Sequence, residues 1–279
     1  MNYAAQPVDY WWVAAGAVAM TVAMLAAWRA VAATHRSQAA WQFVQVSLTD
    51  TALLLVALGI ALRWVRLGHG PFLNMFEILA SSLFSLGVAW RVTHLRVQRL
   101  RDIAPMVLTL LAVLAAWLLV VDPADTHLPA TYEMTVLWFH VALGKVFLGC
   151  ALVATGIAGV VLARATRRGR LWFERVPGDA VLDALVWRFM MAALVFESLM
   201  LVAGAVWAQD AWGRYWAWDP LETWAFVTWL TLAGAIHARL AWRVAPRVSA
   251  LMIVGVFAIA FLTFFGVPFI STAPHKGAV

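Results

Sequence analysis

Histidine and tryptophan are the residue types of this chain that could carry chemistry. Seven histidines are spread along the 279 residues, and tryptophan occurs 17 times. Imidazole nitrogens bind metal ions, and indole rings offer flat apolar surfaces. A single histidine in an apolar helix is more often a structural residue than a ligand, so the histidines need a second signal before any of them is assigned a role.

The second signal is a tryptophan-rich segment at residues 207–229, which reads WAQDAWGRYWAWDPLETWAFVTW. Six of its 23 residues are tryptophan, whereas an aromatic belt at the membrane surface spreads tryptophan over many spans. Gly213 permits a tight turn, and Asp219 before Pro220 predicts a helix start. The segment therefore predicts a π-rich platform for a planar ligand. Arg214 could meet a carboxylate of that ligand, and histidines could supply axial nitrogens if it were a metalloporphyrin.

The composition places these residues in a membrane protein. Hydrophobic residues make up 64% of the chain, charged residues make up 12%, and the mean hydropathy is +0.84. Soluble domains are nearer to ~45–50% apolar and ~25% charged. The single cysteine, Cys150, allows no intramolecular disulfide and no cysteine metal cluster. The composition excludes an ordinary soluble domain, a disordered chain and a nucleic-acid reader.

Eight apolar stretches are long enough to cross a bilayer, which takes about 20 residues of helix. They predict an all-α polytopic membrane protein that forms one integral-membrane domain over residues 1–279. The first stretch has no basic residues before it and no cleavage site after it, so we interpret it as a retained span. The stretches are 11–28, 46–65, 72–90, 103–121, 134–163, 186–208, 221–241 and 249–268.

The arginine and lysine residues predict the orientation. The loops after the first, third, fifth and seventh spans hold 15 of the 20, the opposite side holds four, and Lys145 lies inside a span. The positive-inside rule puts the 15 in the cytoplasm, so both termini and the tryptophan-rich segment face outward. His140 and His275 then lie near the outer face. His237 lies about 24 Å deeper, at 1.5 Å per helical residue.

Ionisable residues inside spans are costly, so each is a candidate for function. Glu77, Lys145 and Glu197 are such residues. The structural interpretation is that they pair with each other or cap polar contacts inside the bundle, and either glutamate could neutralise Lys145. The histidines that we expect to be solvated in loops are His35, His94 and His127.

At these residues the sequence resembles the haem-handling cytochrome c assembly proteins. Residues 212–224, WGRYWAWDPLETW, are similar to the tryptophan-rich (WWD) signature of that family, although Leu221 stands where a lysine is usual. Residues 69–77, HGPFLNMFE, match a His-x-Pro-x-x-Asn-x-x-Glu element at the start of a span. The FFGV stretch at 264–267, followed by a tail histidine, is also similar. The similarity covers about residues 48–275 and is to the CcsA (ResC) branch of the system II pathway.

The resemblance implies a haem-handling subunit of the cell (inner, cytoplasmic) membrane. With a CcsB (ResB) partner it would export haem b and present it to the C-x-x-C-H segment of apocytochrome c, as part of a haem-attachment synthase (haem lyase). In the family, two outward histidines hold haem against the tryptophan-rich loop, and they correspond to His140 and His275. An inner haem site corresponds to His237. The other implied cofactor-binding residues are His69, Trp207, Trp212, Arg214, Trp216, Trp218, Asp219 and Trp224.

Three alternatives remain open. A CcmC-like exporter would deliver haem to a haem chaperone, but such proteins have about six spans. A non-haem transporter or structural subunit would use the tryptophans only as a membrane belt. A quinone-linked cytochrome b would need facing histidine pairs at membrane depth, where this chain has only His237. We find no nucleophile–base pair, phosphate loop or zinc motif, so the sequence predicts no catalytic residue of its own.

Overall fold

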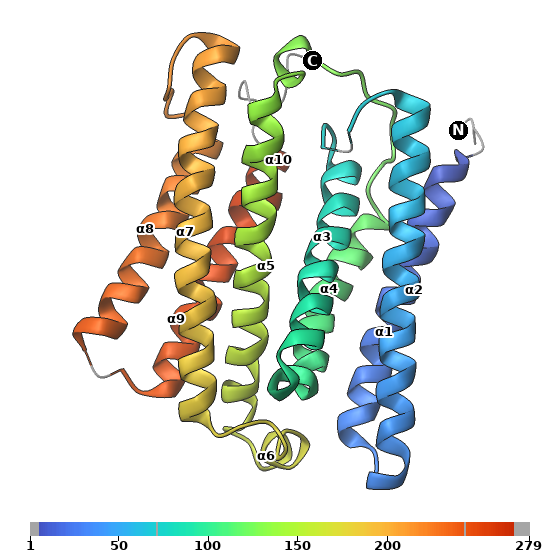
Figure 1. Ribbon diagram of the computed structural model, residues 1–279, viewed down its shortest axis with the longest axis vertical. Coiled ribbons are helices and arrows are strands. Elements are labelled where there is room, and N and C mark those ends of the chain that lie inside the picture. The colour runs from blue at the N-terminus through green and yellow to red at the C-terminus, as the bar shows by residue number, and fades with distance from the viewer. Residues whose placement is uncertain (1–5, 71, 243, 271–279) are drawn as a thin grey trace. The chain divides into compact units, whose positions relative to one another are not determined.

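The computed structural model describes residues 6–70, 72–242 and 244–270, and these residues form helices without a β-strand. The all-α prediction is therefore confirmed (Figure 1). In chain order the helices are α1 Val8–Ala32, α2 His35–Leu67, α3 Met75–Arg96, α4 Ala104–Leu118, α5 Thr135–Ala163, α6 Arg167–Trp172, α7 Asp179–Trp212, α8 Pro220–Ala241, α9 Pro246–Phe261 and α10 Val267–Ile270. Short helical segments are η1 Gln98–Ile103, η2 Ala130–Tyr132 and the π-helical η3 Leu262–Gly266.

Seven segments among the described residues are long and apolar enough to span a membrane. They confirm a polytopic membrane protein and match seven of the eight expected stretches. The eighth stretch forms α8, whose 22 residues would extend about 33 Å at 1.5 Å each. Because α8 carries Glu222, His237, Arg239 and several threonines, it is less apolar than the seven. The seven segments are Val8–Ala32, Arg36–Leu67, Met75–Arg96, Gln98–Leu118, Thr135–Ala163, Asp179–Trp212 and Pro246–Gly266.

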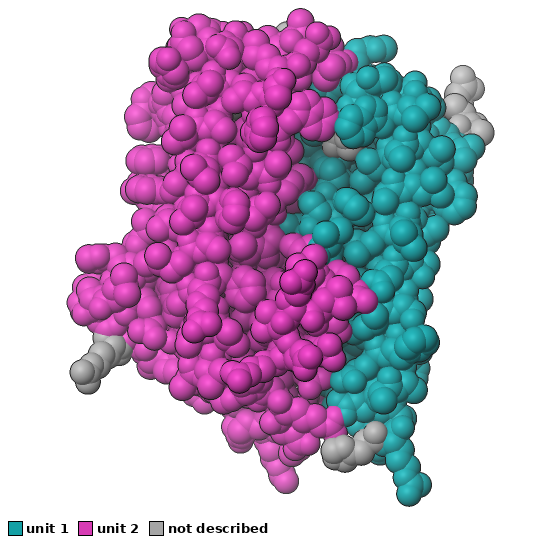
Figure 2. All heavy atoms as spheres, in the orientation of Figure 1, with its two compact units in different colours: residues 1–88, 107–127 teal, residues 89–106, 128–279 magenta. Residues whose placement is uncertain are grey.

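The chain packs as two compact units (Figure 2), and the single integral-membrane domain over residues 1–279 stays a prediction. Unit 1 comprises residues 1–88 and 107–127, and unit 2 comprises residues 89–106 and 128–279. Each unit has its own buried apolar side chains, such as Met20 and Leu83 in unit 1 and Phe147 and Leu232 in unit 2.

In unit 1, two glycines set the spacing of α1 and α2. A Cβ atom built on Gly16 would lie 2.9 Å from the carbonyl oxygen of Ala52, and one built on Gly59 would lie 2.9 Å from that of Asp9. Both distances are too short for a real Cβ atom, so the two backbones approach more closely than any larger residue would permit. Helices in membranes commonly associate in this way, through small residues at the contact.

In unit 2, α5 is the central helix and packs against α7 and α9. Both turn predictions for the tryptophan-rich segment are confirmed. Gly213 ends α7 in the left-handed conformation, with φ of 76°. Asp219 caps α8 by accepting a hydrogen bond of 2.9 Å from the backbone N–H of Glu222, with Pro220 as the first helical residue. Loop residues 213–219 are thereby held at both ends.

The predicted orientation can be checked with reporter fusions. A fusion after residue 127 should be read outside the cell, and one after residue 170 should be read in the cytoplasm, because the loop that holds residue 170 is strongly basic. An external signal at residue 170 would invert the orientation. A fusion after residue 275 tests α8 separately: an external signal means that α8 crosses the membrane, and a cytoplasmic one means that it does not.

Candidate functional site

The side chain of His140 on α5 is oriented by the backbone of α7. Its Nδ1 atom lies 2.9 Å from the carbonyl oxygen of Met200. A carbonyl oxygen can only accept, so Nδ1 carries the proton and, in the neutral ring, Nε2 carries the lone pair. Metal-binding histidines are held in this way by a second hydrogen bond that fixes tautomer and ring direction. The local geometry therefore suits His140 to act as an axial ligand.

A cluster of three aromatic rings lies beside His140. The ring of Trp207 is nearly parallel to the imidazole, with 22° between the planes and 6.4 Å between the centroids. The Trp207 side chain is buried, and its indole N–H donates a 2.9 Å hydrogen bond to the carbonyl oxygen of Thr131. The rings of Tyr132 and Trp212 meet the Trp207 ring edge-on, with centroid distances of 5.4 and 4.8 Å. These contacts hold the ring beside the histidine in one orientation.

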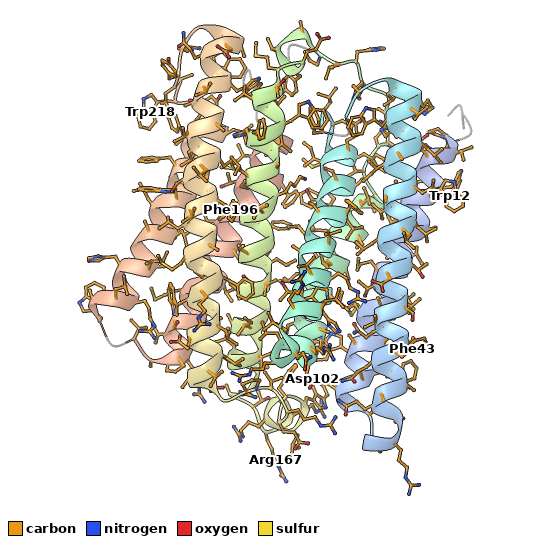
Figure 3. All side chains as sticks on the ribbon, in the orientation of Figure 1. Trp12, Phe43, Asp102, Arg167, Phe196 and Trp218 are labelled. Carbon is orange, nitrogen blue, oxygen red and sulfur yellow. The ribbon has the colours of Figure 1, made fainter. Side chains whose placement is uncertain are left out.

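The loop before α8 presents a second aromatic group. The rings of Trp216 and Trp218 meet edge-on at 5.6 Å, and Trp216 also meets Phe226 of α8 at 6.2 Å. Trp218 is 67% exposed and points away from the helices of unit 2 (Figure 3). Its φ of 57° is rare for a bulky residue and marks local backbone strain, which often accompanies function. The Glu222 carboxylate steadies this loop by accepting a 2.7 Å hydrogen bond from the N–H of Ala217.

Two polar groups of the tryptophan-rich segment are available to a ligand. The indole N–H of Trp216 is buried and has no hydrogen-bond partner among the described residues. Arg214 is exposed in the same loop. A buried donor without a partner costs free energy unless a bound molecule satisfies it. A ligand with two carboxylate groups could accept a hydrogen bond from the Trp216 N–H and pair with the Arg214 guanidinium.

His237 lies on the exposed side of α8. Trp224, Val227, Leu230 and Gly234 are exposed on the same side, at spacings of three and four residues. The C-terminal end of α8 is held from the opposite direction, since Arg239 donates hydrogen bonds of 2.6 and 3.1 Å to Asp183 of α7. The His237 imidazole therefore faces away from the interior of unit 2, where lipid or another chain would meet it.

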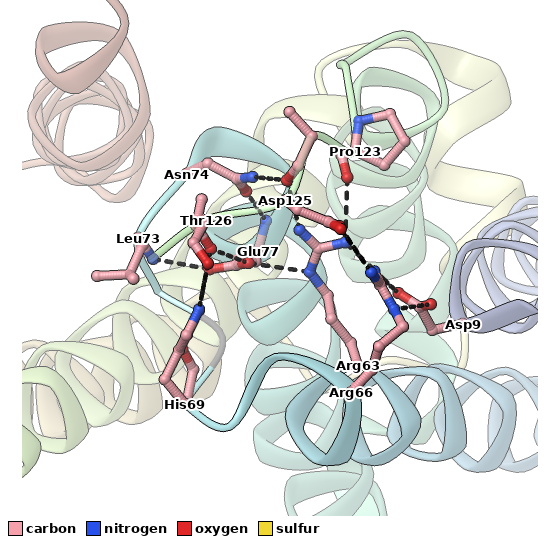
Figure 4. Close-up of polar contacts among 12 residues, drawn as sticks. Asp9, Arg63, Arg66, His69, Leu73, Asn74, Glu77, Pro123, Asp125 and Thr126 are labelled. Carbon is pink, nitrogen blue, oxygen red and sulfur yellow. Dashed lines mark hydrogen bonds and ion pairs between the residues drawn. The ribbon is translucent and has the colours of Figure 1, made fainter. Parts of the chain in front are cut away.

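His69 belongs to unit 1, whereas the tryptophan-rich segment belongs to unit 2. Its Nδ1 atom lies 3.0 Å from the carbonyl oxygen of Gly70, and its Nε2 atom lies 2.9 Å from that of Thr126 (Figure 4). Both ring nitrogens are thus turned toward hydrogen-bond acceptors of the protein. In this arrangement His69 does not present a lone pair to a metal. His275, the other predicted outer ligand, lies outside the described residues.

The motif around His69 has a structural explanation. Asn74 accepts a hydrogen bond from the N–H of Glu77, and Glu77 accepts one from the N–H of Leu73, both at 2.9 Å, which makes a reciprocal cap for α3. The second oxygen of Glu77 accepts hydrogen bonds from Arg63 and Thr126, also at 2.9 Å (Figure 4). The motif therefore caps α3 and joins it to α2 and to the loop before α5.

A buried ionic network completes this part of unit 1. Arg63 also donates to the carbonyl oxygens of Pro123 and Ala124 and lies 3.4 Å from Asp9. Arg66 pairs with Asp9 at 2.9 Å and with Asp125 at 2.7 Å. Arginine suits this role because one guanidinium group can donate hydrogen bonds to several acceptors at once. The network ties the ends of α1, α2 and α3 to residues 123–126.

The expected pairing of Lys145 with a glutamate is wrong. Glu77 is paired with Arg63 instead. Glu197 on α7 is fully buried, and neither of its carboxylate oxygens has a hydrogen-bond partner among the described residues. Sequence position could not reveal this, because Arg63 was expected at the end of a span and its reach to α3 depends on the packing of the helices.

The fold and the site define a class: an all-α polytopic membrane protein in which the histidine His140 is held by a backbone carbonyl oxygen beside the ring of Trp207. The family model described as "Cytochrome C assembly protein" matches residues 11–275. The chain therefore belongs to this family, and its role is in cytochrome c biogenesis. The match includes the span 48–275 from which the resemblance was first inferred.

Curated relatives are similar over most of their length. The "Cytochrome c biogenesis protein CcsA" of Parasynechococcus marenigrum (strain WH8102) is 30% identical, with 86% of this chain and 88% of the relative covered. The protein of the same name from Synechococcus sp. (strain CC9605) is 29% identical over 94% of both chains. That of Prochlorococcus marinus (strain MIT 9312) is 26% identical over 84% of both. The similarity supports the system II assignment.

The ionic network generates a stability prediction. Glu77→Ala should lower the free energy of unfolding by about 3–5 kcal/mol, because it leaves the buried Arg63 without its nearest carboxylate. Asp125→Ala is the matched control, since Asp125 is 57% exposed and its pair with Arg66 should contribute no more than about 1 kcal/mol. The measurement is the thermal unfolding midpoint of each variant in detergent. Equal midpoints for the two variants would contradict the structural role of Glu77.

Proposed function

We propose that this protein binds haem b as a substrate near the outer face of the membrane and presents it for attachment to apocytochrome c. The observation that carries the proposal is the geometry of His140. Its Nδ1 proton is directed at the Met200 carbonyl oxygen, so the lone pair of the neutral ring lies on Nε2, and Trp207 lies nearly parallel to the ring. His275 is proposed as the second axial ligand, on the family resemblance. Two neutral imidazoles would leave the iron no open position for oxygen.

The tryptophan-rich segment supplies the remaining contacts in this proposal. Trp216 and Trp218 offer apolar ring surface beside the macrocycle, as Trp207, Trp212 and Trp224 do along α7 and α8. The indole N–H of Trp216, which has no hydrogen-bond partner in the described part of the chain, and the exposed guanidinium of Arg214 suit the two haem propionates. Asp219 acts indirectly, because it caps α8 and so holds the loop in place. The geometry of His69 gives no support for a direct contact with haem, and we leave it out of the proposed site.

The proposed chemistry needs orientation more than acid or base groups. In attachment, each cysteine thiol of the C-x-x-C-H segment adds across a haem vinyl group: sulfur bonds to one vinyl carbon, and hydrogen goes to the other. Holding the reactants in one geometry can contribute several kcal/mol to such a step. The histidine of the C-x-x-C-H segment can then displace one imidazole of this chain, which transfers the haem to the cytochrome.

His237 is proposed as a ligand of a second, inner haem position that is used during export. It lies on the exposed side of α8 among apolar residues, where a neighbouring subunit can reach it. A CcsB (ResB) partner would supply the second axial ligand of this position. We place the complex in the cell (inner, cytoplasmic) membrane, with the tryptophan-rich segment on the outer side.

The tryptophan contribution can be tested with a matched pair of double variants. Trp216→Ala with Trp218→Ala should lower the haem content of the purified protein severalfold, because both rings lie in the proposed site. Trp11→Ala with Trp12→Ala removes two exposed tryptophans from α1 and should leave haem content unchanged (Figure 3). The measurement is haem absorbance per protein. An equal loss of haem in both double variants would mean that the tryptophans of this segment act only as an aromatic belt at the membrane surface.

The histidines test the two haem positions separately. His140→Ala should leave haem bound at the inner position but abolish cytochrome attachment, and it should change the absorption spectrum of the outer haem. His237→Ala should reduce total haem, because loading from the cytoplasmic side fails. His127→Ala, in an exposed loop, is the control. Full haem content and full cytochrome assembly in His237→Ala would disprove the inner site, and an unchanged spectrum in His140→Ala would disprove the outer one.

A further inference from the structure

Gly204 on α7 is the point at which the imidazole of His140 meets the helix. A Cβ atom built on Gly204 would lie 2.8 Å from Cε1 of His140 and 2.9 Å from Nδ1. The third of the three nearest heavy atoms is Nε2 of the same ring, at 3.8 Å from the Cβ atom. Real Cβ atoms do not approach other atoms as closely as 2.8 Å, so the ring occupies the space that any other residue at position 204 would fill.

The same helical turn provides the acceptor for the imidazole. In an α-helix the N–H of residue 204 bonds to the carbonyl oxygen of residue 200, so Met200 and Gly204 are the two ends of one turn. The Met200 carbonyl oxygen also accepts the His140 Nδ1 proton at 2.9 Å. The Nδ1–Cε1 edge of the imidazole therefore faces this turn, and Nδ1 can reach the carbonyl oxygen only because position 204 lacks a side chain.

The imidazole has little room to withdraw. Trp207, one turn further along α7, lies nearly parallel to it and is itself held by the Thr131 carbonyl oxygen and the edge of Trp212. A methyl group at position 204 would push the ring by several tenths of an ångström or more. That movement would lengthen the Nδ1 hydrogen bond or disturb the ring alignment.

We propose that Gly204 is a positioning residue for the haem ligand His140. By leaving room for the ring, it allows the Met200 carbonyl oxygen to hold the Nδ1 proton and so to direct the Nε2 lone pair toward the iron. The inference rests on the proposed role of His140. Loss of a hydrogen-bond partner of a ligating histidine typically weakens metal binding by about 10–100-fold, and Gly204→Ala should weaken haem retention at the outer site by an amount in that range.

The decisive experiment removes the histidine side chain and replaces it with soluble imidazole. His140→Ala leaves a vacant space above Gly204, so added imidazole should restore the ligand and the absorption spectrum of the outer haem. The double variant His140→Ala with Gly204→Ala should need at least about tenfold more imidazole, a difference of about 1.4 kcal/mol, because the new methyl group fills that space. This variant should fold, since the three atoms nearest to the added methyl group all belong to the deleted imidazole. Equal imidazole requirements would overturn the proposal.

Two single variants separate positioning from packing. Gly144→Ala places a Cβ atom 3.0 Å from Sδ of Met200 and 3.1 Å from Phe264, so it disturbs the packing of α5, and none of its three nearest atoms belongs to His140. Gly255→Ala on α9 meets no atom within 4 Å. Both should keep the outer-haem spectrum, which Gly204→Ala should change. A spectral change in Gly144→Ala as large as that in Gly204→Ala would overturn the inference, whereas an unaltered spectrum in His140→Ala would overturn the proposed function itself.

Discussion

The close contact between α5 and α7 is the interaction on which the proposed haem site depends. Lipid tails are as apolar as leucine, so the hydrophobic effect does little to bring membrane helices together, and close contacts at small residues matter more. Here Gly204 lets an imidazole lie against a helical turn, and the Met200 carbonyl oxygen orients it. The proposed ligand His140 is thereby held by a backbone atom. This atom is fixed by the helix, whereas a side-chain partner could rotate away.

The tryptophan-rich segment depends on a different kind of constraint. Gly213 ends one helix and Asp219 caps the next, so the loop between them is short and defined at both ends. Within it, Trp218 adopts a strained backbone conformation and exposes most of its ring. A family that handles a large flat substrate benefits from rings that are ordered before the substrate binds. The conformational entropy of these side chains is then lost on folding and does not weaken binding.

Unit 1 shows how ionisable groups are accommodated in an otherwise apolar protein. Asp9, Arg63 and Glu77 are almost fully buried, yet each is paired, and the arginine also satisfies backbone carbonyl oxygens of the loop before α5. Charges that are removed from water need such partners. Glu197 in unit 2 is the contrast, because its buried carboxyl group has no hydrogen-bond partner among the described residues.

Much of this protein could be predicted from the sequence because the relevant signals are local. Apolar length predicts the spans, Asp219 before Pro220 predicts a helix start, and the tryptophan run predicts the family. The low mean hydropathy of α8 shows the limit of such patterns. A polar residue lowers the mean hydropathy by the same amount whether its side chain faces lipid or protein. Which glutamate pairs with which base, and how His140 is oriented, are not local properties. They depend on which helix faces meet, and Gly204 and His140 are 64 positions apart in the sequence, so only the tertiary structure decides that they touch.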